Sequence, residues 1–103
     1  MTERYGWMET GTASGQVTVA KAAEAGSQHI IYGVYAAFDS TAEAGLTISD
    51  GTTLFQTNVY DAGSFTFPAG FVGAVGAAVT AVLSSGGVVG RLNMHGTTRK
   101  STF

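Results

Sequence analysis

The sequence predicts an all-β protein, an antiparallel β-sandwich of jelly-roll type. Apolar residues alternate at period two in several short runs, which is typical of half-buried strands. Gly, Asp and Ser separate these runs at the spacing of tight turns. The chain has 103 residues, the usual length of one domain. About seven short strands with such turns are typical of a sandwich.

The first predicted strands follow the N-terminal segment. In GQVTVA, Val17 and Val19 share one face and Gln16 and Thr18 share the other. The next run, QHIIYGVYAAF at 28–38, is apolar on both sides, so we expect it to be a central strand. Its alternation places Ile30, Tyr32, Val34, Ala36 and Phe38 on one face and Ile31 and Tyr35 on the other.

Two further strands are expected within GLTISDGTTLFQTNVY, residues 45–60, joined by a hairpin at Asp50-Gly51. On the first strand Leu46 and Ile48 are expected to point inward, and on the second Phe55, Thr57 and Val59 share one face. A short strand SFTF follows, with Phe65 and Phe67 on one face. We expect Pro68 to end that strand, because proline cannot donate to a sheet ladder.

An uncharged run covers residues 62–90 and allows several interpretations. A membrane-spanning helix is disfavoured because the run is largely Gly and Ala and is broken by SSGG. A phosphate loop is disfavoured because Gly70, Gly73 and Gly76 fit no phosphate-binding motif. The remaining interpretation is a connection, AGFVGAVG, followed by a hairpin about Gly86-Gly87. Its second strand turns Val88, Gly90, Leu92 and Met94 inward and Val89, Arg91, Asn93 and His95 outward.

Composition narrows the possible partners. Charged residues make up 12% of the chain, against about 25% in an average domain, so the surface suits contact with something other than water. The net charge of −2 and five scattered basic residues argue against nucleic acid as a partner. Cysteine is absent, and the early acids of the N-terminus argue against a secretion signal. We therefore expect synthesis in the cytoplasm and no membrane association.

Chemistry-bearing residues do not form a recognisable site in the sequence. His29 and His95 have no acid or cysteine at metal-ligand spacing, and no serine lies in a nucleophile elbow. Asp39, Asp50 and Asp61 are expected to form turns. We predict a non-enzymatic protein without cofactor or metal. Tyr32, Tyr35 and Tyr60 could form an aromatic platform for sugar, which supports a receptor- or glycan-binding module as the alternative function.

The segments HIIYGVYAAF, GLTISDGTTLFQTNV, AGSFTFPAG and FVGAVGAAVTAVLSSGGVVGRLNMHG, in this order, resemble small β-sandwich virion proteins of tailed bacteriophages, some of which decorate the head. The resemblance covers about residues 28–96 and rests on strand order and the glycine-rich segment. It implies a decoration or cement protein that binds the lattice of the major capsid protein at the capsid surface, often as a trimer. It carries over no site residues.

Three parts of the chain are expected: residues 1–14, a sandwich over 15–96, and a tail over 97–103. Residues 1–14 are either an extra edge strand or an arm that inserts Trp7 into a neighbouring subunit. A homotrimer is predicted because several strands are apolar on both faces, which leaves more apolar surface than one thin core covers. Residues predicted to bind a partner are Tyr5, Trp7, Met8, Tyr35 and Val89.

Overall fold

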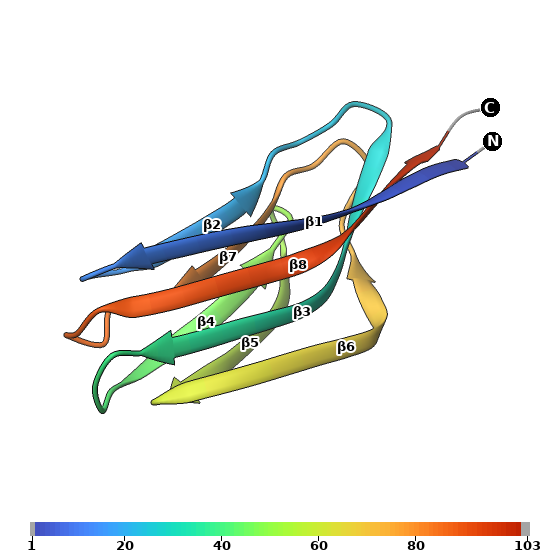
Figure 1. Cartoon of the computed structure of the whole chain (residues 1–103). Helices are drawn as coiled ribbons and strands as arrows, with labels where there is room; N and C mark the ends of the chain where they lie inside the picture. The colour runs from blue at the N-terminus through green and yellow to red at the C-terminus, as the bar shows by residue number, and fades with distance from the viewer. Residues whose placement is uncertain (1, 102–103) are drawn as a thin grey trace.

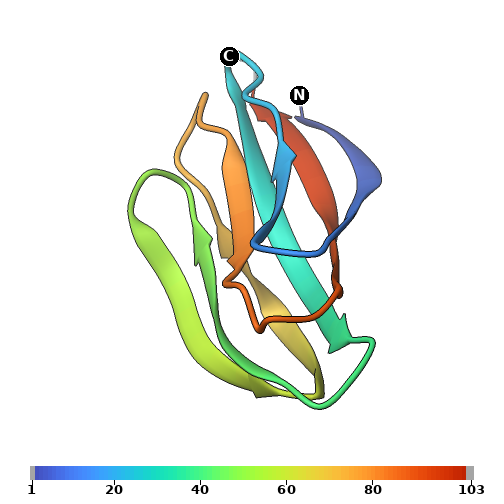
Figure 2. The ribbon, with the colours of Figure 1, turned by 90° about the vertical axis from the view of Figure 1, so that its left-hand side faces the viewer.

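The computed structural model describes the backbone of residues 2–101 and the side chains of residues 5–100. It has two four-stranded antiparallel sheets, packed face to face (Figures 1 and 2). The strands are β1 (Thr2–Ala13), β2 (Val17–Lys21), β3 (Ser27–Phe38), β4 (Glu43–Ser49), β5 (Thr53–Tyr60), β6 (Ala62–Val72), β7 (Val79–Leu83) and β8 (Gly90–Ser101).

The strand order is that of a jelly roll. The first sheet, sheet I, has the order β1-β8-β3-β6, and the second, sheet II, has the order β2-β7-β4-β5. The first strand therefore pairs with the last, the second with the seventh, the third with the sixth, and the fourth with the fifth. This is one long antiparallel hairpin, turning at the β4–β5 connection and rolled into two layers. The predicted fold class is confirmed.

The core lies between the sheets and consists of the residues that the alternation turns inward. Val17 and Val19 are 2% and 4% exposed. The fully buried side chains from the later strands include Leu46, Ile48, Leu83, Leu92 and Met94. The hairpin at Asp50-Gly51 also forms as expected, with β4 and β5 antiparallel across it. For these strands the period of the sequence was sufficient to predict the face.

A β-bulge in β3 changes the predicted faces of that strand. In the pairing with β8, Ile31 is opposite Gly96 and Gly33 is opposite His95, so Tyr32 is an extra residue. An extra residue reverses the alternation beyond it. Ile31 consequently joins Val34 and Ala36 in the core, whereas Ile30 is buried outside that cluster. The single face predicted from Ile30 to Phe38 is wrong at this bulge.

Pro68 does not end a strand. β6 continues through it to Val72, because β6 is an edge of sheet I and an edge position needs no proline donor. Around Pro68 the ladder is interrupted: Thr66 faces Gly33, and the next pair is Phe71 with Ile31. Gly70 takes a φ of +78° there, where a Cβ would collide with Ile30.

The predicted hairpin about Gly86-Gly87 is also wrong. β7 lies in sheet II between β2 and β4, whereas β8 lies in sheet I between β1 and β3. The glycines belong to a connection that crosses from one sheet to the other. Alternation within each strand predicted which residues are buried, but it carries no information about which sheet a strand joins.

The N-terminal segment is a strand. Thr2–Ala13 pairs with β8 along its whole length and forms an edge of sheet I. β8 in turn continues to Ser101, so residues 97–101 are not a tail. Thr2 and Ser101 are paired, so the start of β1 and the end of β8 lie side by side at one end of the sandwich (Figure 1). Within residues 2–101, no helix of the length and apolarity needed to cross a bilayer is found.

We predict that Leu92→Ala destabilises the protein by about 2–5 kcal/mol, because the change removes a fully buried side chain and leaves a cavity. Arg91→Ala, on the exposed face of the same strand, should have a much smaller effect. Urea denaturation of both variants measures the difference. Equal losses would mean that the inward and outward faces of β8 are assigned incorrectly.

Candidate interaction surface

Neither a pocket nor a group of three metal-ligating side chains occurs in the described part of the chain. Buried His29 has a structural role: its Nδ1 lies 2.7 Å from Thr98 Oγ1 and its Nε2 lies 2.8 Å from the Ala22 carbonyl oxygen. Because a carbonyl only accepts, Nε2 donates to Ala22, and in the neutral ring Nδ1 then accepts from the Thr98 hydroxyl.

The aspartates expected at turns hold connections in place. Asp50 Oδ1 accepts from the Thr52 amide at 3.1 Å, and its Oδ2 accepts from the Ala74 amide at 2.8 Å. Asp61 has a φ of 66°, and its Oδ1 accepts from the Ala42 amide. Asp39 instead binds Arg91 through both carboxylate oxygens, at 3.0 and 3.1 Å. This hydrogen bonding and the negative charge of Asp39 raise the pKa of Arg91.

Two of the predicted partner-binding residues are engaged within the chain. The Trp7 indole packs against the core, edge-on to His29 with the ring centroids 6.0 Å apart. Tyr5 donates a hydrogen bond to the Glu24 carboxylate, and the Lys21 amine lies 5.3 Å from the Tyr5 ring centroid. Trp7 therefore closes the end of its own sandwich and does not project as an anchor.

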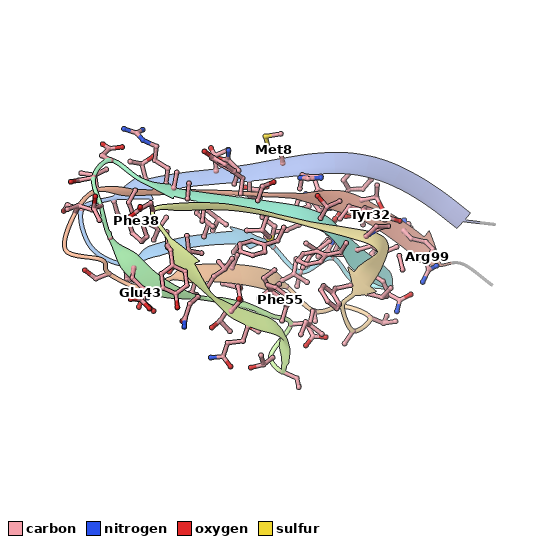
Figure 3. The ribbon with its side chains drawn as sticks, turned by 90° about the horizontal axis from the view of Figure 1, so that it is seen from below. Met8, Tyr32, Phe38, Glu43, Phe55 and Arg99 are labelled. Carbon is pink, nitrogen blue, oxygen red and sulfur yellow. The ribbon has the colours of Figure 1, made fainter. Side chains whose placement is uncertain are left out.

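Two others, Met8 and Tyr35, lie on the outer face of sheet I, on the two strands that flank β8 and in neighbouring rows. Met8 of β1, His95 of β8 and Gly33 of β3 form one row across the sheet. Two residues along each strand, Thr10, Asn93 and Tyr35 form the next row on the same face. Paired residues share a face and stand about 5 Å apart. Met8 is 64% exposed and Tyr35 46% exposed. Figure 3 shows Met8 on the outer side of its layer.

We call this surface the Met8–Tyr35 face and define it as Met8, Thr10, Tyr35, Ser64, Thr66, Asn93 and His95. None of these residues is an acid, a lysine or an arginine. The His95 ring covers Gly33, where a Cβ would collide with it. The nearest charge on the following row is Arg91, already paired with Asp39. The face is a flat region of methionine, aromatic, amide and hydroxyl groups.

Val89 is not part of this surface. It lies in the connection between β7 and β8, half-buried, and its carbonyl oxygen accepts from the Asp39 amide at 2.9 Å. The tyrosines expected to form a sugar platform are also separated. Tyr35 is on the outer face of sheet I, whereas Tyr60 follows the outward positions Gln56 and Asn58 on sheet II. Each outer face thus presents one of these two tyrosines.

His95 and Asn93 were predicted to face outward but were not assigned to a site. The alternation that buries Leu92 and Met94 already turns these two residues away from the core. Their proximity to Met8 depends on the pairing of β1 with β8. A prediction that residues 1–14 pair with the last strand would have brought the three residues together.

Comparison with known proteins shows the fold. The sequence matches no protein-family model, and no curated protein is similar to it. A solved structure of Bacillus endospore appendages, described as disulfide-linked pili, has a TM-score of 0.56 at 16% identity, over 99% of this chain and 89% of that one.

Viral shells are also among the similar structures. A virus-like particle of the extra small virus of the prawn Macrobrachium rosenbergii gives a TM-score of 0.49 at 16% identity, over 99% of this chain and 81% of that one. The capsid of Helicobacter pylori bacteriophage KHP30 gives 0.44 at 12% identity, over 99% and 100%. Carbohydrate-binding modules are among the weaker matches. At 16% identity, the likeness to the endospore appendage structure establishes a common fold alone.

We predict that Trp7→Ala lowers the free energy of unfolding by about 3 kcal/mol, because it removes a large ring packed on the core and on His29. Met8→Ala, one position along on the outer side, should change it by less than about 0.5 kcal/mol. Thermal and urea unfolding of the two variants check this. Similar stability of Trp7→Ala and wild type would contradict the inward placement of Trp7.

Proposed function

We propose that this protein is a non-enzymatic structural protein of a tailed-bacteriophage virion and that it binds the capsid lattice through the Met8–Tyr35 face. The observation that carries the proposal is the combination, on one flat sheet face, of exposed Met8 and Tyr35 with a complete lack of formal charge. The resemblance of segments 28–96 to head-decoration proteins indicates which assembly to test first.

The energetics of such a face favour contact with protein. Fully buried parts of protein interfaces are depleted in charged residues and enriched in Tyr and Met. Burying the Met8–Tyr35 face would remove apolar surface from water without the cost of desolvating an ion. Arg91 and Asp39 lie at its margin as a mutually neutralised pair, where interface rims are usually polar.

The rigidity of the face also supports this function. Asn93 and His95 are on β8, and Tyr35 is on β3, and both strands are paired on both sides within sheet I. A surface held by sheet hydrogen bonds loses little conformational entropy on binding. A cement protein that stiffens a shell needs a surface of this kind, because the bound subunit then resists deformation along with the lattice.

The homotrimer remains a prediction under this proposal. A cyclic trimer repeats one heterologous contact, which joins two different patches of the subunit. An outer face with exposed apolar groups can supply one of the two patches. Light scattering of the purified chain measures the mass directly. A mass of one subunit at all accessible concentrations would contradict the trimer but would not affect lattice binding by single subunits.

A second candidate function is glycan binding at the same face. The observation that favours it is the position of Tyr35 beside Asn93 in one row and near His95 in the next. An aromatic ring with adjacent amide and imidazole groups can stack on a sugar and bond its hydroxyls. Against it, the structure places Tyr35 and Tyr60 on different sheets, so a platform of these two tyrosines does not form.

Charge placed on the Met8–Tyr35 face tests the proposal. We expect the double variant Met8→Lys/Tyr35→Lys to bind capsids at least about 30-fold more weakly, as expected when interface residues worth about 2 kcal/mol are lost. The control is Thr18→Lys/Thr47→Lys, which adds the same charge to the outer face of sheet II. Cosedimentation with assembled tailed-phage heads measures both.

Three results would contradict the proposal. The wild-type protein could stay in the supernatant, the two double variants could bind equally well, or a glycan array could show binding that Tyr35→Ala abolishes. The third result would favour the glycan-binding module. Circular dichroism of each variant must show the wild-type β spectrum, so that a loss of binding is not a loss of fold.

A further inference from the structure

β5 is an open sheet edge with an unusual sequence. It pairs with β4 on one side, and no strand of the described chain pairs with it on the other. Its eight residues, TLFQTNVY, contain no charge, no proline and no glycine. An edge strand leaves a row of backbone N–H and C=O groups without sheet partners, and it is a ready template for another strand.

The other three edges carry features that hinder strand addition. β6 contains Pro68 and an interrupted ladder. β2 has five residues and ends in Lys21. β1 includes acidic and basic residues and the glycines Gly6 and Gly11. Charges, proline, irregular ladders and short length are the usual means by which proteins protect edges. The ladder of β5 with β4 is irregular at its first residues, where Ile48 is opposite Phe55 and Ser49 is opposite Thr53, but residues 55–60 of β5 pair regularly and carry neither charge nor proline.

A cluster of aromatic rings on the same side of the sandwich is incompletely covered. Phe55 of β5 contacts Phe65, Phe67 and Phe71 of β6, with ring centroids 5.0–5.9 Å apart, and Phe67 and Phe71 are 4.5 Å apart. All four rings are half-buried, although they pack on the core. β5 and β6 are the neighbouring edges of the two sheets here, so this side lacks a strand that would complete the burial.

We propose that β5 pairs antiparallel with β5 of a second copy of this chain, about a two-fold axis at Thr57. An open edge, eight uncharged residues of strand-forming composition and a partly exposed aromatic cluster all lie on the same side. Pairing with a second copy would both satisfy the free backbone groups of β5 and cover part of the aromatic cluster. Because the contact is isologous, the same strand supplies both halves of the interface.

The side chains of β5 set the register of this pair. Inward residues must face inward residues, so the strand can shift only in steps that keep the faces matched. With the axis at Thr57, Phe55 is opposite Val59 of the partner subunit, and Gln56 is opposite Asn58 of the partner subunit. The first is an aromatic–β-branched pair and the second can hydrogen-bond, both favourable across strands. An axis at Gln56 would instead set Phe55 against Thr57 of the partner subunit.

This interface is separate from the Met8–Tyr35 face. β5 is at the edge of sheet II, whereas that face is the outer side of sheet I. The inference therefore stands independently of capsid binding. Two-fold pairing of single chains gives a dimer, and two-fold pairing of the predicted trimers gives six subunits when the two axes are perpendicular and meet. In either case, removing the β5 contact halves the mass.

Complementary charge variants test the pairing and its register. In Gln56→Lys/Asn58→Lys, each lysine faces a lysine of the second copy, and in Gln56→Glu/Asn58→Glu each glutamate faces a glutamate. Directly opposed like charges destabilise a strand pair. We expect each variant alone to show half the wild-type mass by light scattering at high protein concentration. An equimolar mixture should recover the full mass, since every lysine then faces a glutamate.

The matched control is Thr47→Lys/Ser49→Lys, which places two lysines at the same spacing on β4, a strand already paired on both sides. It should keep the wild-type mass. The proposal is overturned if the wild type has the same mass as the β5 variants, or if their mixture does not recover the larger species. Met8→Lys/Tyr35→Lys should retain the β5 contact, so a failure of capsid binding and a failure of this pairing are distinguishable.

Discussion

The pairing of β8 with its two neighbours is the interaction on which the rest of the structure depends. β8 is bonded along its length to β1 on one side and to β3 on the other, so the two ends of the chain meet in sheet I. This long-range pairing closes the roll that the β4–β5 hairpin begins. It places Trp7 over His29 inside the sandwich and Met8 beside His95 outside it. The register of the β1–β8 pair thus decides both that Trp7 is inside the sandwich and that Met8 is outside it.

The scarcity of charged residues has one physical consequence in the interior and another on the outer faces. Inside, the aliphatic residues of both sheets form one continuous core, and His29 is accommodated by two hydrogen bonds. Outside, polar uncharged side chains replace the acids and lysines usual on sheet faces. Such surfaces cost little to desolvate, which makes them suitable for permanent contact with other protein. The described residues that are charged, such as Asp39 and Arg91, lie mainly near strand ends and turns.

The two sides of the sandwich differ in how they are closed. On one side β1 and β2 are joined by a short turn, and Trp7 and Tyr5 cover the space between the sheets. On the other side β5 and β6 are both edges, and half-buried phenylalanines fill the space between them. Pro68 and the interrupted ladder of β6 hinder strand addition, whereas residues 55–60 of β5 have neither feature. A jelly roll of this size can thus offer one edge for pairing while protecting the rest.

The sequence alone determined the fold class, most of the strands and the buried face of nearly every strand, because alternation at period two is a local property that one segment carries by itself. It therefore predicted Leu92 and Met94 inside and Asn93 and His95 outside. It did not determine the bulge at Tyr32, the passage of β6 through Pro68 or the separation of β7 from β8, since each depends on which strand lies alongside. The same limit applied to the site: Met8 and Tyr35 were identified singly, but only the pairing of β1, β8 and β3 placed them on one face, because strand partners are chosen by contacts between residues far apart in the chain.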